Sequence, residues 1–353
     1  MFGIKAQVSK EWKSRLANVA EFNQYAEHHS VEFKDAVLEN FSLVGARFSG
    51  AKFLRTNWSE ADFKDSLVED SLFDGGDYRG ISFGGSVLRN VTFKNITFYS
   101  ADFGQAELDN VKFIKCNFGG AKFHGLEKSR IEFVDSVLEE VRFYDSDVDV
   151  RYVDSKLTEV GMMGTTAQDY FVIKSSDVYD LNLEDSKLPY VEVSDSTIKK
   201  MSYHGGKSKK LVMKNLKGAI QASGLYADEV DIENVVTDVL ILDGLQGKSV
   251  KISKVNATSD VHLGSEADSV EIEDSDIYQL WNGGSKVGFY SIKNTKLGGE
   301  STTSSKFGKL HFENVTIVEG ANFEYTQADE VEIHNVTKGP NFEFLGEGSN
   351  VKF

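Results

Sequence analysis

The chain has 353 residues, 40% of them hydrophobic and 27% charged, and a formal net charge of −16 at pH 7. No apolar run approaches the roughly 20 residues of a membrane span, and the first residues lack the continuous apolar stretch of a signal peptide. We therefore expect no membrane insertion, and either a cytoplasmic location or export by a route without a cleaved signal peptide. The acidic charge is spread along the chain without a basic patch, which disfavours direct nucleic-acid binding.

The first 30 residues are predicted to form a helical cap. Between residues 9 and 29, large apolar side chains recur at helical spacing, and Ser9 is placed to cap the helix start. These side chains are Trp12, Leu16, Val19, Phe22 and Tyr25. The end of a repeat array exposes unpaired backbone and core, and this helix would cover it.

Residues 31–150 follow a period of five. A large apolar residue stands at every fifth position from Phe33 to Val148, with Lys128 as the polar exception. Small or aliphatic residues, such as Ala61 and Cys116, come two positions earlier. A second period of 20 is marked by Phe33, Phe53, Phe73, Phe93, Phe113 and Phe133. A chain that turns by a right angle every five residues returns above itself after 20, about 4.8 Å away, so these side chains are expected to stack inside a coil.

The segments ADFKD, ADFGQ and AELDN carry the pattern most clearly. On these residues the chain resembles the pentapeptide-repeat family, most clearly over residues 31–150. The resemblance implies a right-handed quadrilateral β-helix. Members of the family differ widely in function, so the resemblance alone indicates little about activity.

After residue 150 the fives blur, but the period of 20 persists. Motifs such as FVIKSS, VEVSDS, VKISKV and VEIEDS place their third residue about 20 apart, and Val153 would link them to the phenylalanine column. We therefore expect an all-β fold, a single continuous right-handed β-helix over residues 31–353. It would have about 17 coils of 20 residues, regular in 31–150 and degenerate in 151–353. The glycine-rich stretches YHGGKSKK, LWNGGSKVG and LGGESTTSSK are predicted to bulge as loops.

The sequence gives no pattern of catalytic chemistry. The seven histidines share no column, Cys116 falls on an inward position, and the carboxylate clusters at 144–150 and 271–277 fit corner positions that bond to backbone. No nucleophile elbow or phosphate-binding loop is found. We therefore predict no catalytic, cofactor-binding or metal-binding residues, and a protein that is not an enzyme.

The favoured function is a non-enzymatic scaffold that binds another protein, of the kind that bacterial effectors of this family exemplify. Tyr278, Trp281 and Tyr290, in the irregular second half, are the candidate contact residues. The chain stops at Phe353 in register with the repeat, so Val351 and Phe353 are predicted to form an end-on interface, with an end-to-end homodimer as one outcome.

Two alternatives remain open. Some proteins of the family mimic DNA in size and negative charge and act on topoisomerases, and the net charge of −16 suits such a role. Against it, basic residues are numerous and interspersed, and the deciding feature is whether carboxylates line one face continuously. A carbohydrate- or receptor-binding β-helix is the other alternative, and a cleft with carboxylates and exposed aromatics would support it.

Overall fold

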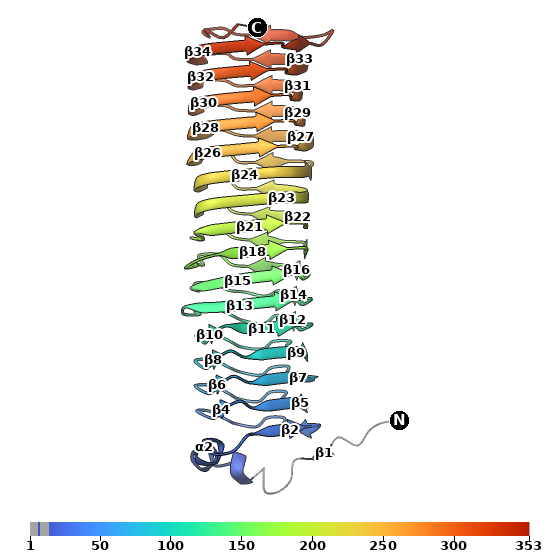
Figure 1. The fold of residues 1–353 in the computed structure, drawn as a ribbon, viewed down its shortest axis with the longest axis vertical. Helices are drawn as coiled ribbons and strands as arrows, with labels where there is room; N and C mark the ends of the chain where they lie inside the picture. The colour runs from blue at the N-terminus through green and yellow to red at the C-terminus, as the bar shows by residue number, and fades with distance from the viewer. Residues whose placement is uncertain (1–5, 8–13, 353) are drawn as a thin grey trace, which may run out of the picture. The chain divides into compact units, whose positions relative to one another are not determined.

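Short parallel strands make up almost all regular structure in the computed structural model, which describes residues 6–7 and 14–352 (Figure 1). By their internal contacts, the residues form two units, 1–182 and 183–353, and each is described by itself. The all-β prediction is confirmed. In both units, strands pair in parallel with a register near 20 residues, as a stack of coils requires.

Among its described residues, unit 1 contains the helix α2 (Val19–Ala26), a helical turn at 14–16 and twenty strands. The strands are β1 (Ala6–Gln7), β2 (Glu32–Lys34), β3 (Ala36–Val37), β4 (Arg47–Ser49), β5 (Lys52–Asn57), β6 (Leu67–Glu69), β7 (Leu72–Asp77), β8 (Val87–Arg89), β9 (Thr92–Thr97), β10 (Glu107–Asp109), β11 (Val111–Ile114), β12 (Asn117–Gly119), β13 (Ser129–Val134), β14 (Val137–Glu139), β15 (Val148–Val153), β16 (Lys156–Thr158), β17 (Val160–Gly161), β18 (Phe171–Lys174), β19 (Asp177–Val178) and β20 (Leu181–Asn182).

The core of unit 1 is built from columns of identical positions. Phe93, Phe113 and Phe133 pair directly across β9, β11 and β13. Their rings stack at centroid distances of 5.1 Å for each pair and are fully buried. Because aromatic faces fill the interior without gaps, this column accounts for the period of 20. Cys116 lies buried on the neighbouring small-residue column, as predicted.

The corners of the coil explain the polar residues between the apolar ones. Residues at successive corners, such as Asp70, Asn90 and Asn110, adopt a left-handed backbone that Asn, Asp and Gly tolerate best. Their side chains form ladders: the Asn90 amide donates to Asp70 at 3.0 Å, and the Asn110 amide donates to Asn90 at 2.9 Å. Each carboxylate cluster places one residue at such a corner. Asp145 and Asp274 have positive φ, so their corner position accounts for these two residues.

The repeat is locally irregular near residue 128. Lys128 is exposed, and Ser129 takes the inward place, in register with Val148. The register of 20 is regained at Phe133, which pairs with Phe113, but the next coil is one residue shorter. As a result Tyr152, not Val153, pairs with Phe133 and then with Ile173. The link through Val153 was therefore wrong by one residue. Both residues are apolar, so hydrophobicity alone does not distinguish them.

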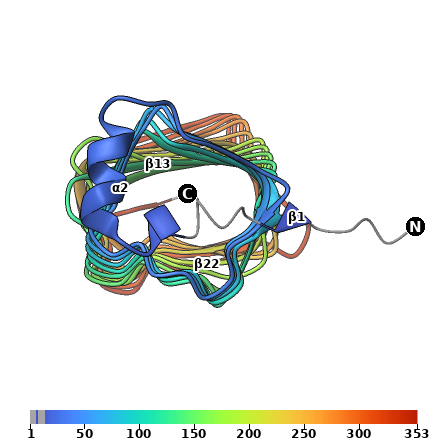
Figure 2. The same ribbon diagram turned by 90° about the horizontal axis from the view of Figure 1, so that it is seen from below.

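Helix α2 covers the first coil, as expected for a cap (Figure 2). Phe22 is buried and packs on Phe48 at 5.0 Å between ring centroids. The Asn23 side chain accepts from the Arg47 N–H at 2.8 Å and donates to the Gly45 carbonyl at 3.1 Å. Residues 14–16 are also helical, and α2 begins separately after Asn18, whose side chain caps it by accepting from the Glu21 N–H at 3.3 Å. Ser9 and Trp12 lie outside the described residues.

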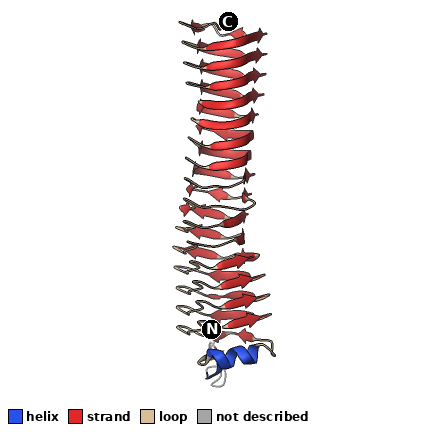
Figure 3. Cartoon of the chain, turned by 90° about the vertical axis from the view of Figure 1, so that its left-hand side faces the viewer, coloured by secondary structure: helices blue, strands red, loops and turns tan. Residues whose placement is uncertain are grey.

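Unit 2 has longer strands (Figure 3). They are β21 (Tyr190–Ser194), β22 (Thr197–Ser202), β23 (Lys207–Gln221), β24 (Tyr226–Thr237), β25 (Leu240–Ile241), β26 (Leu245–Ser253), β27 (Asn256–His262), β28 (Ser265–Glu273), β29 (Asp276–Trp281), β30 (Lys286–Lys293), β31 (Lys296–Ser301), β32 (Lys306–Glu313), β33 (Thr316–Asn322), β34 (Gln327–His334), β35 (Thr337–Lys338) and β36 (Glu343–Leu345).

The glycine-rich stretches of unit 2 are not bulging loops, which corrects that prediction. Residues 203–210, 280–288 and 297–306 form strands joined by tight turns within the coils. Gly205 and Gly284 occupy left-handed corner positions, and Gly298 lies in β31, where an added Cβ would come within 2.2 Å of the Tyr278 carbonyl oxygen. Glycine is needed here for close backbone approach within regular coils.

The predicted core column continues through unit 2, and its levels can be counted. One column runs through Val193, Met213, Ile232, Ile252, Ile272, Ile292, Phe312 and Ile333. These are eight levels, as are Phe33, Phe53, Phe73, Phe93, Phe113, Phe133, Tyr152 and Ile173 in unit 1. The expected seventeenth level falls on Phe353, which lies outside the described residues. Val351 is buried, so of the two residues predicted for an end-on interface the described one is not accessible.

Candidate functional site

Strand β29 carries two exposed aromatic residues. Its in-and-out alternation is interrupted by Tyr278 and Gln279, which are both outside the core, so Leu280 returns inward and Trp281 points out. The neighbouring strand β27 has a bulge at this level, between Ala257 and Asp260. As a result, Tyr278 is 55% exposed and Trp281 is 42% exposed.

Small residues in the next coils leave space beside Trp281. Gly299 follows Gly298 in β31, and Ser301 lies in register with Trp281. Gly320 lies opposite Gly299 in β33. Together with Glu319 and Glu343, among other residues, they line a hollow of 330 Å³ on one side of the indole. A second hollow, of 370 Å³, lies beside Tyr278.

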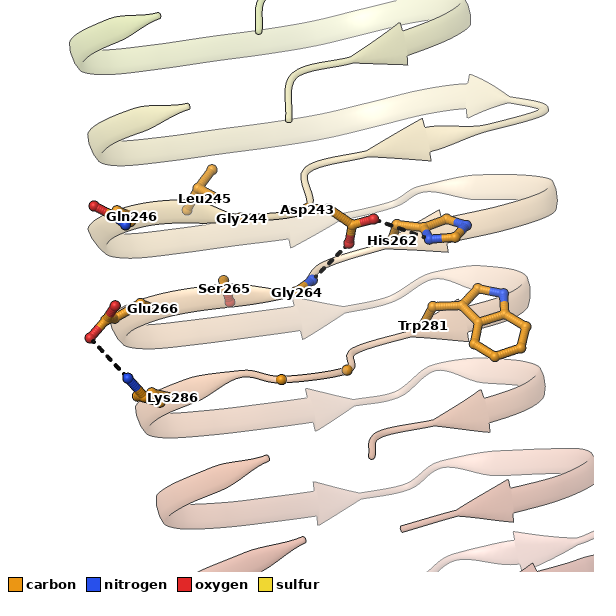
Figure 4. Close-up of a pocket in the computed structure, with 12 residues that line it drawn as sticks. Asp243, Gly244, Leu245, Gln246, His262, Gly264, Ser265, Glu266, Trp281 and Lys286 are labelled. Atoms are coloured by element: carbon orange, nitrogen blue, oxygen red, sulfur yellow. Dashed lines mark hydrogen bonds and ion pairs between the residues drawn. The ribbon is translucent and has the colours of Figure 1, made fainter. Parts of the chain in front are cut away.

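A larger hollow of 460 Å³ lies at the glycine-rich corner on the other side of Trp281 (Figure 4). Its lining includes Gly244, Gly264, Gly283 and Gly284, together with polar side chains from three successive coils. Asp243 accepts from the Gly264 N–H at 3.1 Å and lies 3.4 Å from His262 Nδ1. Lys286 Nζ lies 3.8 Å from Glu266. The absence of side chains on the corner glycines is what opens the surface here.

The indole of Trp281 is oriented by its neighbours. Its Nε1–H donates to Asp260 at 3.3 Å, and its ring lies over the His262 ring with the centroids 6.2 Å apart. A side chain held from two sides loses less conformational freedom on binding, which favours its use as an anchor. We call Trp281, Tyr278 and the three hollows beside them the tryptophan face.

The three sequence candidates in unit 2 do not lie together. Tyr278 and Trp281 share the tryptophan face, but Tyr290 is fully buried. It occupies an inward column between Val270 and Leu310. Tyr290 is therefore a core residue and not a surface anchor. Asp243, Asp260, His262, Glu266 and Lys286 were missed, because their nearness to Trp281 arises from stacking at intervals of about 20 residues.

The tryptophan face is acidic. Six exposed or half-exposed carboxylates surround the aromatics, against two lysines. Lys286 is paired with Glu266, and Lys296 lies 3.3 Å from Asp276. The carboxylates are Asp243, Asp260, Glu266, Asp276, Glu319 and Glu343. This balance favours a ligand with positive charge over an anionic one.

Unit 1 offers a different hollow, of 540 Å³, with mixed charge. Arg130, Arg151 and Lys112 line it with Glu132 and Asp109, and the Arg151 guanidinium lies over the Tyr170 ring at 5.3 Å. Lys112 is paired with Glu132 at 2.9 Å. Since its basic groups already have partners, this hollow is the weaker candidate.

Within the described part of the chain, no group of three or more His, Cys, Asp or Glu side chains is arranged to hold a metal ion. Burial raises the pKa of the Cys116 thiol to about 12, which keeps it protonated and unreactive. No helix among the described residues is both long and apolar enough to cross a membrane.

Residues 24–123 match the family described as the SV2A/B/C luminal domain. No curated protein matches the chain. Among solved structures, full-length QnrB1, a plasmid-mediated fluoroquinolone resistance protein, is 13% identical at a TM-score of 0.27, over 62% of this chain and 92% of that one. HetL, a pentapeptide-repeat protein of the cyanobacterium Nostoc, is 14% identical at a TM-score of 0.23, over 70% of this chain and 96% of that one. PfbA, a surface adhesin of Streptococcus pneumoniae, is 9% identical at a TM-score of 0.21, over 98% of this chain and 91% of that one.

At TM-scores this low, the likeness says nothing about what this chain binds. The architecture follows from the coils themselves. Residues 20 apart pair in parallel, two inward residues precede each corner, and a left-handed residue recurs at the corners every fifth position in the regular part. Each unit of this chain is a β-solenoid, and the regular part of unit 1 has the five-residue pattern of pentapeptide repeats.

Proposed function

We propose that the chain is a non-enzymatic scaffold that binds another protein through the tryptophan face. The observation that carries the proposal is Trp281, a large aromatic side chain exposed on a hydrogen-bonded strand and flanked by hollows. Aromatic anchors with such pockets dominate the binding energy of many interfaces. A β-solenoid supports this use, because its stacked strands hold the anchor in place without an induced rearrangement.

The charge of the tryptophan face defines the partner further. An arginine of the partner would stack on the Trp281 indole and pair with Asp243, Glu319 or Glu343 at its edges. A cation over an indole contributes about 0.5–2 kcal/mol, and its bonds to carboxylates add geometric specificity. We therefore propose a partner that presents cationic side chains to this face.

The DNA-mimic alternative is less well supported by the surface. Outward columns combine both signs: Lys112 stands above Glu132, and Lys309 is 3.0 Å from Glu330. Lys214 and Lys254 both pair with Glu233. DNA presents negative charge at regular intervals, and a mimic needs uninterrupted carboxylates. The columns named here alternate in sign.

The test is affinity capture from lysates with three full-length baits: wild type, Trp281→Ala and Tyr99→Ala. Tyr99 is the matched control, because it is a 41% exposed aromatic of unit 1, against 42% for Trp281. Captured proteins are identified by mass spectrometry at low and high salt, and their affinities are then measured. Cross-linking of the complex maps which partner side chains contact β29.

We expect one partner to be retained by wild type and Tyr99→Ala and to lose at least about 30-fold in affinity with Trp281→Ala. Its cross-links should place arginine or lysine residues at the tryptophan face. Equal capture by all three baits would refute the proposal. A topoisomerase held only at low salt would support the DNA mimic, and Trp281-dependent binding on a glycan array without a protein partner would support the carbohydrate alternative.

A further inference from the structure

The core of unit 2 contains a polar cluster that the repeat pattern does not require. Inward columns of unit 2 are mostly aliphatic, but three of them turn polar in the coils between residues 282 and 302. Glu300 stands between Leu280 and Ala321, and Tyr290 stands between Val270 and Leu310. Asn282, buried directly after Trp281, is the third member. Glu300 is only 2% exposed.

Hydrogen bonds fix the orientation of the cluster. The Ser265 N–H donates to Ser285 Oγ at 3.0 Å, so the Ser285 hydroxyl proton is free to donate to Asn282 Oδ1 at 2.5 Å. With its Oδ1 accepting from Ser285, Asn282 has Nδ2 left as a donor. On the other side, the Thr302 hydroxyl donates to Glu300 Oε1. These two bonds use Asn282 Oδ1 and Glu300 Oε1, and they leave Asn282 Nδ2 and Glu300 Oε2 without a partner.

Three buried polar atoms of the cluster have no hydrogen-bond partner: Asn282 Nδ2, Tyr290 Oη and Glu300 Oε2. Burial raises the pKa of the Tyr290 phenol, and the nearby Asn282 side chain offsets part of this rise. Asn282 Nδ2 and Tyr290 Oη nevertheless do not meet hydrogen-bonding geometry. Glu300 also acts on Tyr290 electrostatically. Asn282 and Glu300 therefore both lie near Tyr290, although all three atoms remain unsatisfied. Native proteins rarely leave such groups unsatisfied.

We propose that Asn282, Tyr290 and Glu300 form an internal site for an ordered water molecule. Buried waters typically make about three hydrogen bonds to groups that lack other partners, and three such groups are present. Asn282 Nδ2 donates to the water, a protonated Glu300 donates through Oε2, and the water donates to Tyr290 Oη. A cation fits less well, because the Asn282 amide presents hydrogens and one carboxylate alone faces the site.

The protonation of Glu300 agrees with this assignment. Burial raises its pKa to about 8, and the bond from Thr302 offsets part of the rise. The titratable group facing it from β30 is Tyr290, whose phenol stays neutral because burial raises its pKa further. Asn282, Thr302 and Ser285 do not titrate near neutral pH. Above about pH 8 the site would lose this donor.

The primary test is a high-resolution crystal structure of the full wild-type chain below neutral pH. We expect one water peak within hydrogen-bonding distance of Asn282 Nδ2, Tyr290 Oη and Glu300 Oε2. A dry interior in which these side chains bond directly to one another would overturn the proposal. A metal ion bound at Glu300, with an unfolding temperature that rises specifically with sodium or potassium, would overturn it too.

Infrared spectroscopy supplies a readout that does not depend on crystals. The carbonyl stretch of a buried carboxylic acid should be present in wild type at neutral pH, absent in Glu300→Gln, and lost from wild type as pH rises through 8. Persistence of the ionised form at neutral pH would refute the donor role of Glu300. In crystals, Glu300→Gln should keep the water and Glu300→Leu should lose it; a water retained in the leucine variant would contradict the site.

Discussion

Replacing Glu300 by glutamine should remove a pH dependence of stability that the wild-type chain carries. In the unfolded chain, a glutamate loses its proton near pH 4.5, whereas buried Glu300 keeps it until about pH 8. Between these values the unfolded state binds fewer protons than the folded state, so the free energy of unfolding falls as pH rises. The stability contributed by the protonated side chain is complete below about pH 4.5 and lost by about pH 8.

The size of the effect follows from the interval. Each pH unit between the two values costs about 1.4 kcal/mol, so the interval from 4.5 to about 8 corresponds to about 5 kcal/mol. Glutamine has nearly the same shape and can still accept from Thr302, but it does not titrate. The free energy of unfolding of Glu300→Gln should therefore be nearly level relative to wild type over the same range.

The assay is urea unfolding of the full chain between about pH 5 and about pH 9, comparing wild type with Glu300→Gln. Repeat arrays can unfold in parts, so a local probe is needed. Trp281 is the tryptophan of unit 2, and replacing Trp58 by Phe reduces the signal of the other unit. Titration of all other groups cancels in the difference between the two proteins. Parallel profiles would refute the buried, protonated state of Glu300.

Three further changes test the fold. Phe113→Ala should lower the free energy of unfolding by about 3–5 kcal/mol, measured in urea, because its buried ring stacks on both neighbours at 5.1 Å. Asn18→Ala should cost about 1 kcal/mol and speed amide exchange in α2, because it removes the helix cap. Gly298→Ala should lower the unfolding midpoint and shift Trp281 emission, since its Cβ would lie 2.2 Å from the Tyr278 carbonyl oxygen.

Each change has a control. Phe344 is 36% exposed, so Phe344→Ala should cost far less than Phe113→Ala, and equal losses would contradict the packing argument. Asn18→Asp keeps a capping oxygen and should exchange like wild type. Gly120→Ala introduces the same methyl at a left-handed corner with nothing within 4 Å, so only a backbone cost of about 1 kcal/mol is expected. A Gly298→Ala variant as mild as Gly120→Ala would disprove the close approach.

The period of 20 in the sequence was sufficient to predict the core residues of unit 1 and many of those of unit 2. The columns of Phe113 and Ile272 were predicted correctly, because a repeat of 20 fixes which residues pair in neighbouring coils. The shorter coil after Phe133 was not resolved, since Tyr152 and Val153 are both apolar and only backbone pairing selects one. The glycine-rich stretches were assigned to loops because composition does not separate a flexible turn from a strand where two backbones approach closely.

Tyr290 was within reach of the sequence. The repeat places an inward residue two positions before each column residue, and Tyr290 stands two before Ile292. Trp281 was named from the sequence as a contact residue, and it is exposed; its outward position follows from Tyr278 and Gln279, which both lie outside the core.

Glu300 shows where hydrophobic periodicity fails to predict burial. Hydrophobic periodicity assigns polar residues to the surface by definition, so it misplaces any carboxylate that the backbone turns inward. Its position follows only from its register with Leu280 and Ala321. A residue that breaks the pattern in this way costs stability, and proteins retain such costs mainly where the group serves a purpose beyond packing. The departures from the repeat, Trp281 outside and Glu300 inside, lie in adjacent coils, and that is why function is sought there.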